Sequence, residues 1–518
     1  MELLDLADGV LLAEYPGASD ADANRAAVGL AAALAALELP GFHDAVPGAR
    51  TLCVLFDSRL LSLDALRNEI LSRGAEPAPP AAGRSLSIPV VYGGADGPDL
   101  PGLAASLGLS AEEVARRHAA ATYEVAFLGF APGFAYLSGL PPELHAERLP
   151  TPRPRVPEGS VAIGGPYTGV YPAAMPGGWR LIGRSPARLI DEDADPPALF
   201  GPGDRVRFEP IGAAEFEARR RELASLFGRA DTAPSGLPLL RIVRPGLFTS
   251  VQGAPRWGNG ASGFSPGGAM DETALARGNR ILGSAPDAGA LEITLLGPEV
   301  EVLRDVGVCV SGAPIDLEHN GVSASPETPL RCRAGDRVRL GPVRRDSRAY
   351  LCVEGGLAPP GRLGLTRRIE AGALVIGEPP GPTSPAPPEA GAPDRSAGGD
   401  LLLGVLPDPR EPVFFEPAAL ETLLASEYRV SSTSDRRGVR LEGPPLACRT
   451  PGIPPEGTAL GTIQVPRDGL PIVLGPDRPV TGGYAKLGTL LAADWPRLAQ
   501  AEPGRRVRFE RRAREGRG

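Results

Sequence analysis

The sequence predicts a mainly β protein with a small α+β unit at its amino terminus. From residue 123 onward, apolar runs of strand length alternate with Gly and Pro turns, and no long helical pattern intervenes until about 213–227. One turn is repeated, since PEGSVAIGG at 157–165 has a counterpart in PEGTALGTI at 455–463. Each copy precedes a basic strand, namely DRVRFEP at 204–210 and RRVRFER at 505–511. Repeats on this scale predict tandem related barrels rather than a solenoid, whose period is shorter and more regular.

The α+β unit is expected over residues 1–80. Apolar runs at 8–15 and 50–56 predict strands, and the spacing of apolar residues at 20–38 and 61–73 predicts helices. We expect this unit to support the site rather than to react.

Three linkers are predicted to separate the remaining units, at 75–84, 228–238 and 379–400. The last is rich in Pro, Ala and Gly. The β units are accordingly expected at 85–227, 238–378 and 401–518, with 379–400 as a linker. The first of them opens with a strand at 86–92 and a helix from Leu109 to His118, for which Ser110 is the predicted N-cap.

Composition excludes several classes of protein. A chain of 518 residues is too long for one core. Its net charge of −8 argues against nucleic acid as a partner, because phosphate binding relies on clustered Lys and Arg. No apolar stretch reaches the length of about 18 residues that a membrane span needs, and the amino terminus has no signal-peptide pattern. We therefore expect a cytoplasmic protein without membrane contact.

Cysteine, histidine and lysine usage excludes further chemistry. The five cysteines are scattered and form no CxxC pair, and no two of the four histidines are spaced to share a metal, so the sequence predicts neither a disulfide framework nor a metal site. Lys486 is the only lysine. A Walker-type phosphate loop and a biotinyl-lysine carrier are therefore both absent.

The stretch FLGFAPGFAYLSGLP, at 127–141, is the clearest candidate for a binding site. Its glycines and Pro132 exclude a helix and predict strand, tight turn and strand, with a backbone that a ligand can approach and rings that form a wall. The alternative is a hairpin that packs for its own sake. With His118 upstream and a second Gly-rich run at 156–179, the stretch is expected to form one site. The candidate ligand contacts are Phe130, Pro132, Gly133, Phe134, Tyr136, Gly164, Gly165 and Tyr171.

A Gly pair followed by a helical pattern, at 267–283, places Asp271 and Asn279 eight residues apart and so on one helix face. A carboxylate and an amide on one face orient a small amide substrate, or else they cap and pack the helix. Glu292 is the only charge in an apolar strand, and both an edge position and a buried functional carboxylate stay open.

The run GTIQVPRDGLPIVLGPDRPVTGGYAKL, at 461–487, combines polar side chains with glycines whose backbone N–H groups suit anions. Its candidate site residues are Gln464, Asp477, Thr481, Gly482, Gly483, Tyr484 and Lys486. Lys486 is a candidate point charge for a phosphoryl or carboxylate oxygen, and the alternative is a solvated side chain. Arg436 and Arg440 are further candidate anion clamps.

These motifs resemble a known family. From about 88 to 208 the chain resembles the B subunit of the prokaryotic ATP-dependent 5-oxoprolinase, and from about 240 to 509 it resembles the C subunit of that enzyme. The same two modules form the carboxyltransferase region of urea carboxylase. The resemblance implies a natural fusion of the B and C subunits, with cyclophilin-like barrels in the three large units and a ferredoxin-like first unit.

The reaction that the resemblance implies is the opening of 5-oxo-L-proline to L-glutamate, coupled to ATP hydrolysis and dependent on a separate A subunit. Acid–base roles are expected for His118, Asp271 and Asp477. The match to a carboxyltransferase motif favours a functional Asn279, and the TGGY context favours a functional Lys486. ATP is implied without a located site, no biotin is expected on this chain, and a homo-oligomer is possible.

Three motifs depart from the family pattern. Residues 250–253 read SVQG where the family has an aspartate after Gln252, which is itself a candidate substrate contact. Residues 311–314 read SGAP without the usual acid. The Gly-rich loop that follows 363–365 is deleted. Two other functions therefore stay open, namely a urea carboxylase-like carboxyltransferase and a catalytically idle regulatory protein like the kinase-inhibitor relatives of the B subunit.

Overall fold

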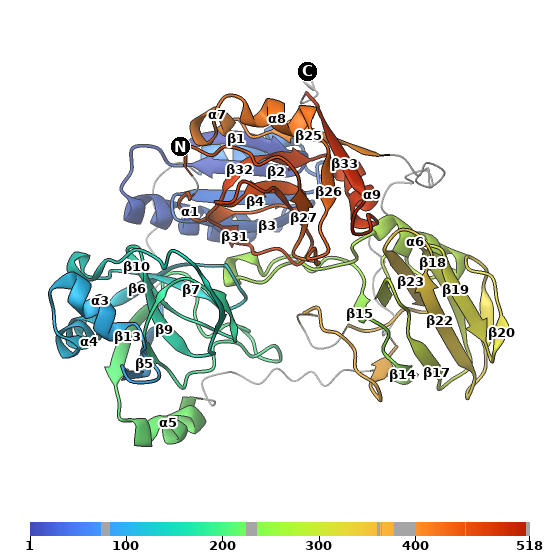
Figure 1. Cartoon of the computed structure of the whole chain (residues 1–518), viewed down its shortest axis with the longest axis horizontal. Helices are drawn as coiled ribbons and strands as arrows, with labels where there is room; N and C mark the ends of the chain where they lie inside the picture. Colours follow the sequence, from blue (N-terminus) through green and yellow to red (C-terminus); the bar gives the residue numbers. More distant parts are fainter. Residues whose placement is uncertain are drawn as a thin grey trace.

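The computed structural model describes residues 1–73, 83–223, 236–359, 363, 365–377, 400–450 and 452–513. The three predicted linkers lie almost entirely outside these residues. Three lobes are visible in Figure 1: the N-terminal unit (1–73) together with the last barrel (400–513), the first barrel (83–223), and the middle lobe (236–377). The mainly β fold with tandem barrels is confirmed.

The N-terminal unit is a four-stranded antiparallel sheet of order β1-β2-β4-β3 with two helices. Its elements are β1 (Glu2–Ala7), β2 (Val10–Glu14), α1 (Asp20–Ala35), β3 (Phe42–Pro47), β4 (Thr51–Phe56) and α2 (Leu63–Ser72). This is the split βαβ arrangement of a ferredoxin-like fold, with its last strand placed first in the chain. Both helices begin after a serine N-cap, Ser19 or Ser62, whose hydroxyl accepts a backbone N–H. The sequence did not predict β1 and β3, because their apolar residues are interrupted by acidic residues and a histidine.

The first barrel is a closed sheet of order β10-β7-β6-β13-β5-β12-β9. Its elements are β5 (Ser85–Tyr92), α3 (Leu100–Leu107), α4 (Ala111–Ala120), β6 (Tyr123–Leu128), β7 (Ala135–Ser138), β8 (Arg153–Val156), β9 (Ser160–Gly164), β10 (Tyr167–Val170), β11 (Met175–Gly177), β12 (Arg180–Arg184), β13 (Arg205–Pro210) and α5 (Phe216–Leu223). Ser110 caps α4 as predicted.

The middle lobe differs from the predicted closed barrel. Its strands form a sheet of order β20-β19-β22-β17-β14-β24 and another of order β15-β16-β23-β18-β21, which share one apolar core. Among the described residues, two isolated bridges, Leu296 to Pro342 and Leu357 to Gly377, link the ends of the two sheets, and Pro342 has no N–H with which to extend its ladder. The elements are β14 (Pro238–Arg244), β15 (Phe248–Gln252), α6 (Glu272–Ile281), β16 (Ala290–Thr294), β17 (Glu299–Val302), β18 (Val306–Gly312), β19 (Ile315–His319), β20 (Val322–Ser323), β21 (Leu330–Cys332), β22 (Arg337–Val343), β23 (Arg348–Val353) and β24 (Leu374–Ile376).

The last barrel repeats the design of the first. Its order is β25-β32-β29-β30-β27-β26-β33, and its final strand β33 pairs in parallel with its first strand β25, as β13 does with β5. In both β13 and β33 the arginines point to solvent while Val and Phe are buried. The elements are β25 (Leu401–Pro407), α7 (Glu411–Phe414), α8 (Ala419–Ala425), β26 (Tyr428–Val430), β27 (Gly438–Glu442), β28 (Glu456–Gly457), β29 (Thr462–Val465), β30 (Ile472–Leu474), β31 (Thr481–Gly482), β32 (Ala485–Leu490), α9 (Trp495–Ala499) and β33 (Arg506–Arg511).

The N-terminal sheet packs directly on the last barrel, although the two are at opposite ends of the chain (Figure 1). One apolar cluster joins Val46, Cys53 and Leu55 of the sheet to Leu406 and Val480 of the barrel. The backbone N–H of Ala49 donates to the carbonyl of Pro455 at 2.7 Å. Within the described residues, no helix is both long and apolar enough to span a membrane.

Candidate functional site

The predicted strand, turn and strand of 127–141 is present as the β6–β7 hairpin. Most of its rings are buried: Phe127 stacks on Tyr136 with ring centroids 4.4 Å apart, and Phe134 meets the edges of Tyr171 and Trp179. Phe130 is different, because it is 39% exposed and has a left-handed backbone with φ of 66°. The hairpin is therefore a packed aromatic wall from which Phe130 reaches the surface.

The glycines of this region serve close packing. A Cβ added to Gly164 would lie 2.5 Å from the ring of Trp179, and one on Gly133 would lie 2.6 Å from Ile190. Gly165 has a positive φ and open space around it, as a turn requires. Pro132 lies half-buried in the loop between the strands.

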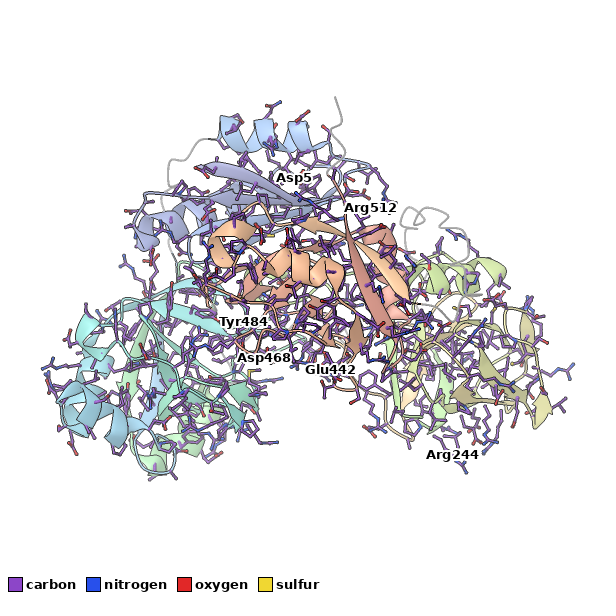
Figure 2. All side chains as sticks on the ribbon, turned by 45° about the horizontal axis from the view of Figure 1, so that its top comes forward. Asp5, Arg244, Glu442, Asp468, Tyr484 and Arg512 are labelled. Atoms are coloured by element: carbon purple, nitrogen blue, oxygen red, sulfur yellow. The ribbon has the colours of Figure 1, made fainter. Side chains whose placement is uncertain are left out.

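Gly129 is the position at which the first and last barrels meet. A Cβ added there would lie 1.7 Å from Oγ1 of Thr481. The loop at 127–134 and the TGGY loop at 481–484, which the sequence singled out separately, are therefore in direct contact. Figure 2 shows the half-exposed Tyr484 on the side of the last barrel that faces the first barrel.

A third segment completes this junction. A Cβ on Gly263 would lie 3.4 Å from the backbone N of Gly133, and Ser265 donates its hydroxyl to the carbonyl of Arg478. Trp257 of the same segment stacks on His43 with ring centroids 4.5 Å apart. The segment 257–265 thus lies against the N-terminal unit and both barrels.

Three polar groups at the junction lack the partners that buried groups normally have. Among the described residues, Nε2 of Gln464 and Oγ1 of Thr481 are buried without a hydrogen bond. Arg478 is only 2% exposed and forms no ion pair with a carboxylate in the described part of the chain. Within the same residues, its side chain makes one long hydrogen bond, from Nε to the carbonyl of Thr458 at 3.4 Å. Buried cations are normally paired, so these groups are the candidate contacts for an anionic or amide ligand.

Thr458 lies close to Arg478 and to Gln464. Its carbonyl accepts from Arg478, and its methyl group lies 3.4 Å from a Cβ added to Gly482, while Nε2 of Gln464 lies 2.4 Å from the same point. Burial lowers the pKa of Arg478 to about 10, against the opposing effects of Cys53 and Asp44, so its guanidinium stays protonated at neutral pH. We call Gln464, Arg478 and Thr481 the unpaired polar set.

The sequence pattern did not predict a role for Arg478, although this residue lies inside the candidate run at 461–487. Arginine is common in this chain, so the sequence gives no reason to single out Arg478. Only the tertiary structure shows that its guanidinium is buried without a carboxylate partner among the described residues.

Lys486 is not solvated, and its charge is already paired. It is 2% exposed, and its Nζ donates to Oε1 of Glu456 at 2.7 Å and to the carbonyl of Gly457 at 2.5 Å. Arg410 holds the same carboxylate bidentately, at 2.8 and 2.9 Å, and also pairs with Asp408. Burial alone would raise the pKa of Glu456, but Lys486 and Arg410 outweigh it and hold the pKa at about 2.

Arg436 and Asp477 join the last barrel to the middle lobe. Arg436 donates to Asp477 at 2.8 Å, to Glu292 at 2.5 Å and to the carbonyl of Gly268. Glu292 is therefore a buried carboxylate rather than an edge residue, and it also accepts from the hydroxyl of Tyr350. Arg440, by contrast, lies exposed on β27.

Asp271 and Asn279 have the contacts of capping and packing residues. Asp271 is the N-cap of α6, accepting from the backbone N of Ala274 at 2.9 Å and from Nε2 of Gln500 at 2.8 Å. Asn279 donates to the carbonyls of Pro286 and Ala288, while its Oδ1 is buried without a partner in the described residues.

Gln252, a predicted substrate contact, is fully buried in β15. Its Nε2 donates to the hydroxyls of Ser250 and Thr366, so this amide nitrogen is occupied by neighbouring side chains.

His118 lies in the interior of the first barrel. Its ring is fully buried between the hydroxyls of Tyr92, at 2.7 Å, and Thr168, at 2.8 Å, and it stacks on Phe208. Burial lowers its pKa from 6.5 to about 3. A neutral imidazole with both nitrogens engaged and no access to solvent is not placed for acid–base work on a ligand.

Two surface hollows, at 445–448 with 466–469 and along 314–326, are lined by none of the predicted site residues. The junction around the unpaired polar set is the place where most of the selected motifs converge.

Comparison with known families accounts for most of the chain. Residues 1–200 match the family described as "Carboxyltransferase domain, subdomain C and D", and residues 262–511 match "Carboxyltransferase domain, subdomain A and B".

Individual relatives also match either the N-terminal or the C-terminal part of the chain. The chain is 49% identical over 177 residues to the B subunit of 5-oxoprolinase from Escherichia coli O157:H7, covering 34% of this chain and 80% of that protein. It is 33% identical over 284 residues to the C subunit of 5-oxoprolinase from Escherichia coli K12, covering 52% of this chain and 90% of that protein. "Urea amidolyase" of Lachancea kluyveri is 28% identical over 303 residues, which are 52% of this chain and 16% of that protein.

A solved structure is similar over the whole length. The crystal structure of the protein TTHA0988 is 33% identical, with a TM-score of 0.80, and the match covers 97% of this chain and 99% of that chain.

Proposed function

The chain belongs to the carboxyltransferase-domain family as a fusion of homologues of the B and C subunits of 5-oxoprolinase, and on this basis we propose that it opens 5-oxo-L-proline to L-glutamate together with a separate A subunit. The single observation that carries this proposal is the contact between the two modules at Gly129 and Thr481, beside buried polar groups without partners. A site built from both modules accounts for a fusion better than two independent sites would.

The unpaired polar set suits a small cyclic amide that bears a carboxylate. The guanidinium of Arg478 binds the carboxylate, and the amide N–H of Gln464 stabilises the charge that develops on the lactam oxygen. Thr481 completes the hydrogen bonds, while Phe130 and Tyr484 form the half-exposed entrance.

Asp477 is the proposed base that activates water. Its side chain is 21% exposed, and Arg436 fixes its orientation. Lys486 and Arg410 both bind Glu456, whose strand β28 pairs with the strand that contains Thr481. These three residues therefore act as positioning residues.

The residues of this chain do not fit the phosphates of ATP. The sequence has no glycine–lysine phosphate loop, and its only lysine is buried in an ion pair with Glu456. We therefore assign nucleotide binding to the separate A subunit, and we derive no step through ATP here. No biotin is expected on a lysine in this position.

Reconstitution tests the proposed function. The purified chain alone should neither hydrolyse ATP nor release glutamate when 5-oxoproline is present, and addition of a cognate A subunit should restore both. Glutamate release by the chain alone would contradict the division of labour, and no turnover with any A subunit would contradict the activity.

The second candidate is carboxyl transfer to a urea-like amide, which the similarity to urea amidolyase favours. The buried Lys486 leaves this chain without a carrier lysine, so a biotinylated partner must act in trans. Transfer of carboxyl from such a carrier to urea, with no response to 5-oxoproline, would support this candidate instead.

A further inference from the structure

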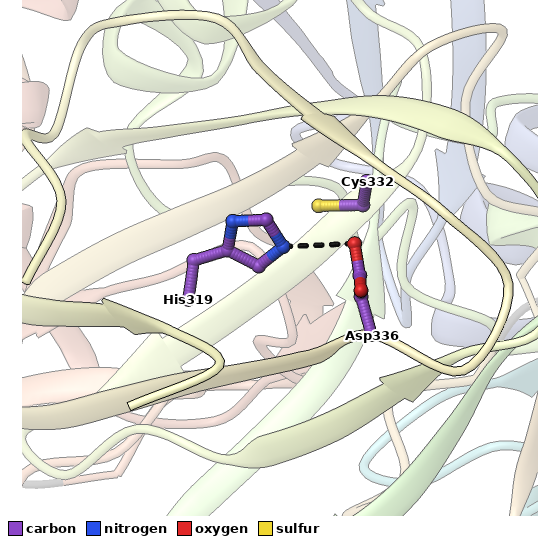
Figure 3. A group of neighbouring side chains, drawn as sticks. All are labelled: His319, Cys332 and Asp336. Carbon is purple, nitrogen blue, oxygen red and sulfur yellow. Dashed lines mark hydrogen bonds and ion pairs between the residues drawn. The ribbon is translucent and has the colours of Figure 1, made fainter. Parts of the chain in front are cut away.

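A cluster of potential metal ligands lies in the middle lobe, apart from the candidate site. His319 ends β19, Cys332 ends β21, and Asp336 lies in the turn that leads into β22 (Figure 3). These strands are on the outer side of the lobe in Figure 1, away from the junction of the two barrels.

The ligand atoms are already close together. Nε2 of His319 lies 2.9 Å from Oδ2 of Asp336, and these atoms and Sγ of Cys332 all lie within 4.8 Å of one another. Cys332 is 3% exposed, whereas the side chains of His319 and Asp336 are 23% and 20% exposed. The cluster therefore has a buried thiol on one side and access to solvent on the other.

Asp336 is oriented independently of His319. Its Oδ2 accepts from the backbone N of Arg333 at 2.8 Å, and its Oδ1 accepts from Nδ2 of Asn320 at 2.8 Å. Asn320 is in turn fixed by the backbone N of Arg337, which donates to its Oδ1. Such outer hydrogen bonds are what hold a carboxylate ligand in place at metal sites.

We propose that His319, Cys332 and Asp336 bind one zinc-class transition-metal ion, through Nε2, Sγ and Oδ2, with a water molecule as fourth ligand. Metal–ligand bonds of about 2.0–2.3 Å fit within this cluster after small side-chain movements. The ion takes the place of the hydrogen between Nε2 and Oδ2, and the neutral imidazole then carries its hydrogen on Nδ1 instead of Nε2. Cys332 releases its thiol proton to solvent as the sulfur–metal bond forms. A thiolate with an imidazole selects zinc or cobalt over magnesium and calcium, which prefer oxygen ligands only.

The ion would join the two sheets of the middle lobe at one end. His319 belongs to the sheet that contains β22, whereas Cys332 belongs to the sheet that contains β18 and contributes to the shared core. The described residues show backbone bridges between these sheets at Leu296–Pro342 and at Leu357–Gly377, and a metal ion at the ligand cluster would add a further link that stabilises the lobe against opening. The sequence predicted no metal site, because the three ligands come from different strands and include a single histidine.

Cobalt titration of the full chain tests the proposal. Metal-free protein is titrated with Co²⁺, and the expected result is one ion per chain, with the visible bands of tetrahedral cobalt and the near-ultraviolet charge-transfer band of a thiolate ligand. Cys332→Ser should lose the charge-transfer band, and His319→Gln should weaken Co²⁺ binding at least about 10-fold. The control Cys448→Ser removes a half-buried cysteine of the last barrel and should leave the titration unchanged.

Thermal melting of the same samples separates a loss of metal binding from a loss of folding. Melting temperatures of the metal-free variants show whether each has folded, and Zn²⁺ should raise the melting temperature of the parent but not of His319→Gln. If the parent gives no charge-transfer band, or if folded Cys332→Ser gives the same band as the parent, the proposal is wrong and the cluster is a plain His–Asp hydrogen bond beside a core cysteine.

Discussion

At the scale of a single residue, Arg478 is a buried charge whose proposed role is in ligand binding and not in the stability of the fold. A buried charge that has a partner destabilises the fold when the partner is lost, whereas a buried charge without one costs stability where it stands. Arg478 forms no ion pair with a carboxylate in the described residues, and this is the observation behind the ligand contact proposed for it.

Replacing Arg478 should therefore affect turnover rather than folding. Arg478→Met is expected to keep or raise the melting temperature while it lowers turnover of the reconstituted enzyme about 10- to 150-fold, the range for a lost hydrogen bond to a charged group of about 1.5–3 kcal/mol. Arg410→Met is the matched control: it breaks the buried pair with Glu456 and Asp408 and should cost about 3–5 kcal/mol of stability. A destabilised Arg478→Met with parental turnover per folded molecule would make Arg478 a structural residue.

His118 should make stability depend on pH. Its pKa is 6.5 when unfolded and about 3 when folded, so between these values only the unfolded chain takes up the proton. Stability from this group is complete above about pH 6.5 and is lost as the pH falls towards 3. Thermal melting from neutral pH down to about pH 4 should show a steeper decline for the parent than for His118→Gln. Equal slopes would contradict the neutral, buried imidazole.

At the scale of elements, the close approach of two loops on different barrels requires a glycine at position 129. Gly129 has no positive φ, so the requirement for glycine there is steric and not conformational. The Thr481 side chain occupies the space that a Cβ would need. The contact therefore sets how closely the hairpin loop and the TGGY loop approach.

Gly129→Ala should push these loops apart. The expected result is a clear loss of turnover in the reconstituted enzyme together with a loss of stability, since Gly129 and Thr481 are both buried where the two loops meet. Gly102→Ala is the control, because nothing lies within 4 Å of its added Cβ and it is inside α3, where alanine is favoured by about 0.5–1 kcal/mol. Parental turnover in Gly129→Ala would show that the approach of the loops is not needed for activity.

At the scale of the whole molecule, the two ends of the chain form one block. The N-terminal sheet packs on the last barrel, Asp44 accepts the backbone N–H groups of Gly258 and Gly260, and Leu363 of the middle lobe belongs to the core of the first barrel. The halves that resemble the B and C subunits are therefore interleaved.

Cutting the chain within 224–235 should consequently leave a stable complex. Residues 1–223 and 236–518, expressed together, are expected to co-elute in size-exclusion chromatography, because the interface includes buried apolar contacts from both barrels and the N-terminal sheet. Trp257→Ala removes the stack on His43 and should weaken the complex. Separate elution of the parental halves would contradict this account of the interface.

Much of the fold and part of the site followed from local sequence. The periodicity of 20–38 and 61–73 predicted α1 and α2, the repeated turn predicted two related barrels, and the Gly-aromatic run predicted the β6–β7 hairpin. These features depend on spacing, caps and turns, which neighbouring residues determine. The same motifs were sufficient for the resemblance to the B and C subunits.

Only the tertiary structure decided which side chains are paired, because a partner is often far away in the chain. It brought Glu456 to Lys486, Glu292 to Arg436, and Tyr92 with Thr168 to His118, and so removed three expected reactive groups from contact with a ligand. It left Arg478 buried without a carboxylate among the described residues. The sequence determined the elements and the family, whereas long-range packing determined which charges are free to act.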